Sequence, residues 1–181
     1  MGQTEATLGA ATGPYLISGG NGALGIWCAD WLAKKVVDCQ LALLSRSGRV
    51  AATLSESWSE LACAPVGVAL VECDVANELS VAKVSAALHP VSRGLAGVLH
   101  AAGVLHDKML RSMVASSVYA VFTPKALAAF HLHVAAACAP LEVLGLFSSM
   151  SSTFGSAGQV NYAAANAFLD ALACSRRRHG A

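Results

Sequence analysis

Charged residues are scarce in this sequence, and none of them are concentrated enough to define a binding surface. Only 13% of the 181 residues are Asp, Glu, Lys or Arg, and the formal net charge is +1. The one basic run, Arg176–Arg178, is interpreted as cations that oppose the negative pole of a helix dipole. We therefore expect no nucleic-acid partner.

The sequence also lacks the segments that would send a chain into or across a membrane. Mean hydropathy is +0.56, but the longest uncharged stretch, residues 143–169, is too rich in Ser, Gly, Asn and Gln for a spanning helix. Residues 1–13 have no basic start followed by an apolar block, so they are interpreted as a linker and not a secretion signal. We expect no membrane span and a cytoplasmic location, or an organelle lumen if the parent protein is targeted.

Patterns for disulfides and metal sites are missing as well. The six cysteines show no C-x-x-C spacing, and most lie in apolar segments, so they are interpreted as reduced core residues. His131 and His133 are two positions apart on an expected helix and therefore point in different directions. We predict no metal site.

What the sequence does have is a regular alternation of short apolar runs with longer amphipathic stretches. Its 55% hydrophobic content and 16 glycines suit a sheet that is covered on both faces, and its length suits one domain. Strands are expected at residues 15–18, 41–44, 66–72, 96–100 and 144–147. Helices are expected at residues 24–36, 51–62, 78–88, 114–137 and 161–178. The predicted fold class is α/β, a Rossmann-like doubly wound parallel sheet with helices on both faces, truncated at its C-terminal strands.

The first expected strand runs into a glycine-rich turn that suits a pyrophosphate. Glycine lets a backbone approach phosphates closely, and the N-terminus of the helix that follows offers free N–H groups and positive potential. The alternative is an ordinary tight turn, which the motif alone does not exclude. The turn consists of Ser18, Gly19, Gly20, Asn21, Gly22, Ala23, Leu24 and Gly25.

The end of the second strand indicates which dinucleotide would bind. An NAD-binding fold would place an acidic residue there to hold the ribose hydroxyls, but this chain has Ser45, Arg46 and Ser47. Arg46 offers a planar charged fork suited to a 2′-phosphate, and the serines can add donors, so NADP is favoured over NAD. A solvated loop arginine is the alternative.

Two further strand ends are candidates for nucleotide contacts. Asp74 and Val75 follow the third strand, and the Asp74 carboxylate can accept hydrogen bonds from adenine or can cap the next helix; both interpretations stay open. The fourth strand ends in small residues that would let a nucleotide pass close to the backbone, after a histidine whose imidazole is interpreted as structural. These residues are His100, Ala101, Ala102 and Gly103.

A third group of polar residues could act on a substrate. Ser148 and Ser149 close the fifth strand, and Tyr162, thirteen residues beyond Ser149, opens a helix that carries Asn166 one turn later. A hydroxyl, a phenol and an amide can then converge on one carbonyl oxygen at the carboxyl end of the sheet, where ligands bind in such folds.

These motifs occur in the order found in the short-chain dehydrogenase/reductase superfamily, and within it the chain resembles the ketoreductase (KR) domains of modular polyketide synthases and animal-type fatty-acid synthases. The resemblance covers about residues 15–180 and rests on the glycine turn and on LLSRSG at 43–48, CDVA at 73–76, HAAGVL at 100–105, FSSMSS at 147–152 and YAAANAFLDALA at 162–173. Ordinary members carry lysine four residues after the tyrosine. Here Asn166 stands there, as in the synthase ketoreductases, and Lys125 lies in a segment similar to that family's lysine segment.

The resemblance implies NADPH-dependent reduction of a β-ketoacyl thioester held on an acyl carrier protein, among neighbouring synthase domains, during polyketide or fatty-acid elongation. In those roles Tyr162 gives the oxygen its proton, Ser149 holds the carbonyl, Lys125 lowers the pKa of the phenol and touches the nicotinamide ribose, and Asn166 supports a water relay. One alternative is a free-standing reductase of small carbonyl compounds, against which Asn166 with Lys125 argues. Another is a noncatalytic Rossmann module, against which the complete tyrosine, serine and lysine set argues.

The same resemblance bears on stereochemistry and on completeness. Asp107 matches the second, more diagnostic aspartate of the signature for D (3R) alcohols, and Phe154 stands where the opposite type has tryptophan, although Ala157 replaces the usual proline. We therefore favour the D (3R) alcohol. Residues 1–13 are expected to be a linker or a remnant of a structural subdomain, and residues 14–181 an NADP-binding core without its C-terminal strands and lid. An isolated fragment of that kind is expected to be weakly active.

Overall fold

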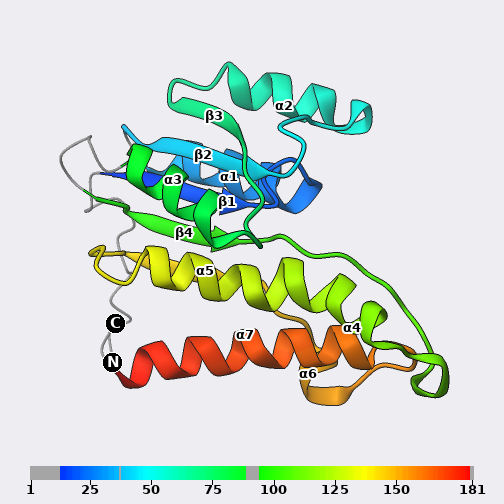
Figure 1. Cartoon of the computed structure of the whole chain (residues 1–181). Helices are drawn as coiled ribbons and strands as arrows, with labels where there is room; N and C mark the ends of the chain where they lie inside the picture. Colours follow the sequence, from blue (N-terminus) through cyan, green and yellow to red (C-terminus); the bar gives the residue numbers. More distant parts are fainter. Residues whose placement is uncertain (1–12, 37, 89–93, 180–181) are drawn as a thin grey trace, which may run out of the picture.

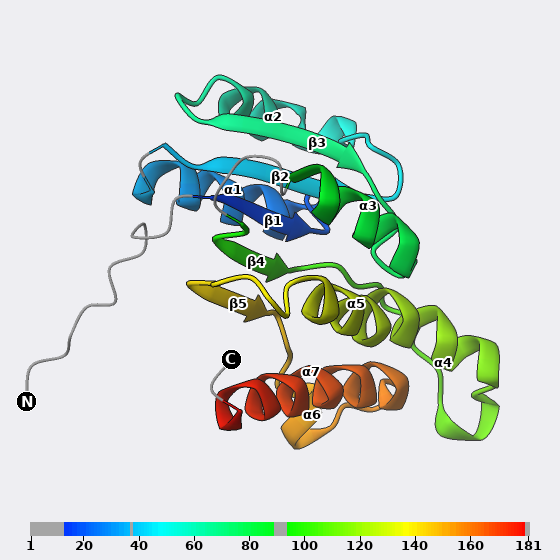
Figure 2. The ribbon, with the colours of Figure 1, turned by 60° about the vertical axis from the view of Figure 1, so that its left-hand side comes forward.

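The computed structural model describes residues 13–36, 38–88 and 94–179, which form one five-stranded sheet with helices on both faces (Figures 1 and 2). All four strand pairings are parallel, and the strand order is β3-β2-β1-β4-β5. The strands are β1 (Pro14–Ser18), β2 (Gln40–Ser45), β3 (Gly67–Glu72), β4 (Gly97–His100) and β5 (Val143–Leu146). The predicted Rossmann-like α/β class, a parallel sheet with helices on both faces, is confirmed. Of the expected linker at residues 1–13, all but Gly13 lies outside the described residues.

Helices connect the parallel strands, because such strands need a crossover between them. The longer ones are α1 (Ala23–Lys35), α2 (Ser55–Ala62), α3 (Glu78–Leu88), α4 (Ala115–Phe122), α5 (Ala128–Ala135) and α7 (Val160–Arg178). Short elements are the 3-10 turns η1 (Ala52–Leu54) and η2 (Leu110–Ser112), the π-helical segment η3 (Thr123–Leu127) and α6 (Ser151–Phe154). Among the described residues, none of these helices combines the length and apolar character that a membrane crossing requires.

Two apolar clusters lie on the two faces of the sheet. Tyr15 and Ile17 of β1 pack with residues of α1 and α2, whereas Leu16, between them, packs with residues of α3 and α5. Every residue of β1 is buried, and so are the last five of β2. The continuous apolar runs in the sequence therefore reflect strands covered on both sides.

The long helix expected at residues 114–137 is helical but not regular. The chain runs from α4 through the π-helical segment η3 into α5. Pro124 has no N–H to donate, and the wider π turn accommodates this gap without ending the helix. The expected helix is therefore present, with a π-helical stretch inside it that includes the buried Lys125.

Helix α7 packs against α4 and η3. Val121, Ala126 and Ala165 form the buried centre of this contact. The rings of Phe122 and Phe168 meet edge to face with centroids 5.8 Å apart. Tyr162 belongs to the same cluster, so this packing brings the first turn of α7 next to η3.

Candidate active site

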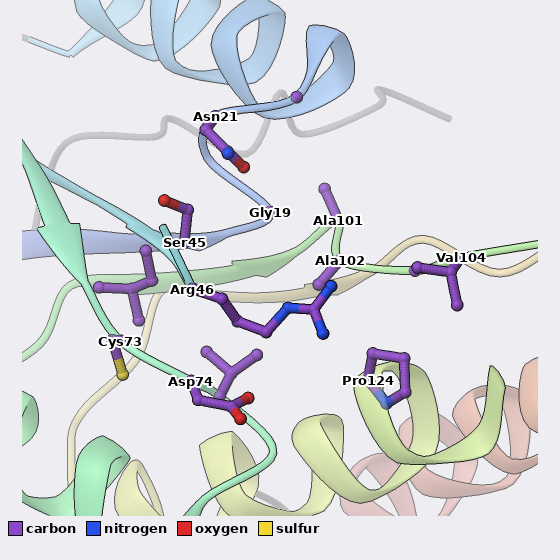
Figure 3. Close-up of a pocket in the computed structure, with 14 residues that line it drawn as sticks. Gly19, Asn21, Ser45, Arg46, Cys73, Asp74, Ala101, Ala102, Val104 and Pro124 are labelled. Carbon is purple, nitrogen blue, oxygen red and sulfur yellow. The ribbon is translucent and has the colours of Figure 1, made fainter. Parts of the chain in front are cut away.

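A hollow of about 190 Å³ lies at the carboxyl ends of the first four strands (Figure 3). Segments far apart in the sequence form its walls, namely the glycine turn, the ends of β2, β3 and β4, and η3. The lining residues are Gly19, Asn21, Gly22, Leu44, Ser45, Arg46, Cys73, Asp74, Val75, Ala101, Ala102, Gly103, Val104 and Pro124. Sequence reasoning had predicted ten of these fourteen, and it had missed Leu44, Cys73, Val104 and Pro124.

Glycine is required in the turn because the backbone packs closely there. Gly19 has φ +69°, and a Cβ on it would lie 2.8 Å from the backbone nitrogen of Ala102. A Cβ on Gly20 would lie 2.7 Å from Cα of Leu43. The turn leads directly into the N-terminus of α1, so the hollow has bare backbone and a positive helix pole on one side. This arrangement fits the diphosphate of a dinucleotide.

Arg46 is the cationic group of this hollow. Its residue is exposed, and Figure 3 shows its guanidinium extending across the hollow, with Asp74 on one side and Ala102 on the other. A planar cation at the end of β2 fits a phosphate ester on the ribose next to the adenine.

Asn21 fixes the loop that carries Arg46. Its Nδ2 donates to the carbonyl oxygen of Arg49 at 2.9 Å and to Oγ of Ser47 at 3.4 Å. Within the loop, the backbone N–H of Gly48 donates to Oγ of Ser45 at 3.0 Å. The glycine turn and the loop after β2 are thus tied to each other. This bracing contact could not be read from the sequence.

Two roles were considered for Asp74, a contact to adenine and the capping of the next helix, and the second belongs to Asn77. Oδ1 of Asp74 accepts the N–H of Ala76 at 3.0 Å, and its carboxylate lies at the hollow. Oδ1 of Asn77 accepts the N–H of Ser80 at 3.0 Å, which is the capping bond of α3. Asn77 therefore caps the helix, and Asp74 stands in the turn before it.

His100 lies behind the hollow and does not line it. It is fully buried, its Nδ1 is 2.6 Å from Oγ of Ser18, and its Nε2 is 2.8 Å from the carbonyl oxygen of Lys125. Burial lowers the pKa of His100 to about 4. The predicted cofactor residues buried behind the surface are Ser18, Gly20, Gly25 and His100, and Ala23 and Ser47 are exposed beside it.

A second hollow of about 230 Å³ continues from the first, with Ala101, Gly103 and Val104 in both walls. It brings Lys125 and Tyr162 together. The ammonium nitrogen of Lys125 donates to the carbonyl oxygen of Phe147 at 2.9 Å and lies 5.3 Å from the centroid of the Tyr162 ring. Leu24, Leu105 and Ser148 are its other lining residues.

The Lys125 side chain is a cation held in a mostly enclosed position. The residue is 5% exposed, and this burial lowers the pKa of its ammonium group. One hydrogen bond to a carbonyl and one aromatic ring face offset the loss of water. A buried cation beside a phenol can stabilise the negative charge that proton transfer leaves on the phenolic oxygen.

The two serines at the end of β5 have different surroundings. Ser148 lines the second hollow, and its Oγ donates to the carbonyl oxygen of Asn166 at 3.4 Å. Oγ of Ser149 accepts the N–H of Ser151 at 3.2 Å and the hydroxyl of Ser151 at 3.0 Å. Ser149 does not line either hollow, but these bonds leave its own hydroxyl hydrogen for another acceptor.

Two buried asparagines hold the first turn of α7. Nδ2 of Asn166 donates to the carbonyl oxygen of Tyr162 at 2.8 Å, and its Oδ1 is buried with no partner among the described residues. Asn161 is 1% exposed and makes three bonds: Nδ2 donates to the carbonyl oxygens of His106 at 3.0 Å and Ser117 at 2.9 Å, and Oδ1 accepts the N–H of Tyr162 at 2.9 Å.

The loop after β4 is joined to the segment before α7 by two more bonds. Oδ2 of Asp107 accepts Nε2 of Gln159 at 3.0 Å, and the N–H of Lys108 donates to the carbonyl oxygen of Gly158 at 2.8 Å. Asp107 is thus held at the side of the site on which Tyr162 lies. Phe154, on α6, is 82% exposed and has no such restraint within the described part of the chain.

All six cysteines are unpaired, as expected for reduced thiols, but only Cys28, Cys39 and Cys73 are buried. Cys63 and Cys138 are exposed, as is Cys174, so the expectation that most are core residues is wrong for half of them. In the described ranges no three His, Cys, Asp or Glu side chains gather into a metal-binding group.

Comparison with known proteins gives consistent matches. The model of the KR domain family matches residues 13–181. Polyketide synthase GfsA of Streptomyces halstedii is 48% identical over 168 residues, which are 93% of this chain and 2% of that protein. The mycoketide-CoA synthase of Mycobacterium tuberculosis is 42% identical over 170 residues, which are 94% of this chain and 4% of that protein. A solved structure described as A-type ketoreductases from a modular polyketide synthase superposes with a TM-score of 0.88 at 36% identity, over 99% of this chain and 38% of that one.

Proposed function

The chain belongs to the KR domain family of polyketide synthase ketoreductases, and from this membership and the geometry of its site we propose that it reduces a β-ketoacyl thioester on an acyl carrier protein with NADPH. As a ketoreductase of the short-chain dehydrogenase/reductase type, it is a reductase that binds a nicotinamide cofactor. The observation that carries the proposal is the meeting of Lys125 and Tyr162 in a hollow continuous with the glycine turn.

The two hollows fit a dinucleotide laid along the strand ends. The glycine turn would hold the diphosphate, and Arg46 supports a preference for NADPH over NADH because its guanidinium extends into the first hollow. Ala101 and Gly103 line both hollows and leave room for the ribose and nicotinamide to pass. When bound, NADPH supplies the hydride that the β-carbon receives.

Residues of the chain would supply the proton that the ketone oxygen receives and stabilise the negative charge that this transfer leaves on the phenol. The phenol of Tyr162 gives its proton to the ketone oxygen as that oxygen becomes an alkoxide. The Lys125 ammonium group, 5.3 Å from the ring centroid, stabilises the phenolate that remains. The Ser149 hydroxyl, whose hydrogen is left free, would hold the ketone oxygen. Ser148, its neighbour in the chain, lines the hollow that contains Lys125 and Tyr162.

The roles of Asn166 and the stereochemical outcome belong to the same proposal. The buried Oδ1 of Asn166 has no partner in the described residues, and it would accept a hydrogen bond from a water molecule that relays protons towards Tyr162. Asp107, restrained by Gln159, supports the D (3R) alcohol as product.

NADPH oxidation with a β-ketoacyl thioester tests the proposal. We expect turnover with the thioester on a carrier protein to exceed turnover with a free ketone, and Tyr162→Phe to abolish it. Tyr119→Phe is the matched control, because Tyr119 is 68% exposed on α4 and lies outside both hollows. The assay is run on this chain and on a version extended at both ends. Unchanged reduction by Tyr162→Phe in both forms would refute the assignment.

The alternative functions predict other outcomes. Equal rates with a free ketone and a carrier-bound thioester would favour a free-standing reductase. NADPH binding without turnover in either form would favour a noncatalytic module. Chiral chromatography of the β-hydroxyacyl product tests the D (3R) assignment separately.

A further inference from the structure

His100 contacts the candidate cofactor turn on one side and the candidate catalytic lysine on the other. Its Nδ1 meets the Ser18 hydroxyl at 2.6 Å, and its Nε2 meets the carbonyl oxygen of Lys125 at 2.8 Å. We propose that His100 is a positioning residue that fixes Lys125 for proton transfer through the hydrogen bond to its backbone carbonyl. This inference rests on the proposed function, because it assigns a role relative to Lys125 and Tyr162.

The bonding partners determine which ring nitrogen of His100 carries hydrogen. The carbonyl oxygen of Lys125 can only accept, so Nε2 must be the donor. The ring is neutral, because burial lowers its pKa to about 4 even though the hydrogen bond to the Lys125 carbonyl acts in the opposite direction. Nδ1 is then an acceptor, and the Ser18 hydroxyl donates to it. Each nitrogen therefore has one role, and the ring cannot flip without losing both bonds.

The π-helical segment makes the backbone hydrogen bonding around Lys125 irregular. The N–H of Ala128 is shared between the carbonyl oxygens of Thr123 and Lys125, so the Lys125 oxygen accepts a shared bond here. The His100 N–H supplies a second donor to that oxygen. A hydrogen bond from a buried ring outside the helix thus holds this irregular segment in place.

Lys125 is held at both of its ends. His100 bonds its backbone carbonyl, and the carbonyl oxygen of Phe147 accepts from its ammonium nitrogen at 2.9 Å. Since β4 carries His100 and β5 leads into Phe147, two neighbouring strands fix one lysine over the Tyr162 ring. A shift of about 1 Å at a catalytic group can cost about a hundredfold in rate.

Ser18 and His100 lie side by side on the neighbouring strands β1 and β4. They are register partners in the pairing of β1 with β4, and both are buried. Ser18 directly precedes Gly19, so the same bonds connect the phosphate-binding turn with the lysine. The lysine is placed by the strand ends that also form the cofactor hollow.

Two variants of the whole protein test the positioning role. His100→Leu removes both bonds, and His100→Gln keeps an amide N–H near the position of Nε2. We expect His100→Leu to lower kcat about ten- to a hundredfold with KM for the thioester changed less than about threefold, and to move the alkaline limb of the kcat–pH profile. We expect His100→Gln to recover kcat to within about tenfold of the unmodified protein.

A readout independent of turnover separates this proposal from the proposed function. Lys125 is 5% exposed and should resist an amine-acylating reagent, whereas Lys34, with a side chain 71% exposed, serves as the internal control. Peptide mass mapping should show faster acylation of Lys125 relative to Lys34 in His100→Leu, reversed in His100→Gln.

The outcomes discriminate clearly between the two proposals. If folded His100→Leu shows unchanged Lys125 acylation and an unchanged kcat–pH profile, the positioning role is overturned. It is also overturned if His100→Gln restores neither the slow acylation of Lys125 nor the kcat–pH profile. If acylation of Lys125 responds as expected but the unmodified protein reduces no thioester, the positioning contact stands and the proposed function fails.

Discussion

Replacing Asn161 with alanine should lower the stability of the protein more than the loss of so few side-chain atoms suggests. The side chain is 1% exposed and makes three hydrogen bonds, to the carbonyl oxygens of His106 and Ser117 and from the N–H of Tyr162. A net contribution of about 1 kcal/mol for each buried bond gives a loss of about 3 kcal/mol in the free energy of unfolding. For a chain of this length that corresponds to a decrease in Tm of roughly 6–12 °C.

Urea and thermal unfolding, followed by circular dichroism, measure this loss. Asn77→Ala is the matched control, because Asn77 is exposed and its side chain makes a single capping bond to Ser80, so we expect a loss of about 1 kcal/mol. Asn161→Asp keeps the acceptor but replaces the donor by a charge facing two carbonyl oxygens, and it should be less stable than Asn161→Ala at neutral pH. An Asn161→Ala loss no larger than that of Asn77→Ala would refute the reasoning.

Three further predictions concern the turn, the cofactor and pH. Gly25→Ala should cost about 1–3 kcal/mol of stability, since its Cβ would lie 2.7 Å from Cα of Gly20, whereas Gly22→Ala, whose nearest contact is at 3.3 Å, should cost less than about 1 kcal/mol in the same unfolding assay. Arg46→Ala should raise the Kd for NADPH about 10- to 100-fold in a fluorescence titration and leave the Kd for NADH nearly unchanged. Folding lowers the pKa of His100 from 6.5 to about 4, so the unfolded chain binds more protons between these two pH values. As pH falls through this window, His100 should therefore reduce the free energy of unfolding by about 3 kcal/mol. A folded His100→Gln variant with the same pH dependence would contradict this.

The sheet was predictable because its signal is local. Strands buried on both faces appear as short apolar runs, and the runs at residues 41–44 and 15–18 lie inside β2 and β1. The edges were less certain: β5 begins at Val143, one residue before the expected start. At strand ends the last bonds depend on neighbouring strands rather than on the residue itself.

The contacts that organise the site were not predictable from local patterns. The bond from His100 to Lys125 joins residues 25 positions apart, and it depends on how η3 lies over β4. The π-helical segment arises at Pro124, but a proline in a helical pattern predicts an end or a kink just as well. The catalytic role of Lys125 was predicted only from the family resemblance, since a single lysine in an apolar helix forms no pattern of its own. The short α6 was missed because four residues hold no periodicity.

The phenol and the ammonium group lie on two separate helices, and this has a consequence for how turnover can be tuned. Their spacing is set by the contact of η3 and α4 with α7, where Phe122 and Phe168 meet. The proposed proton transfer is therefore sensitive to the distance between these helices, and it would slow if this contact loosened even while every helix kept its backbone hydrogen bonds. Phe122 and Phe168 line neither hollow, so substitutions at these two rings could adjust the rate without altering the walls of the site.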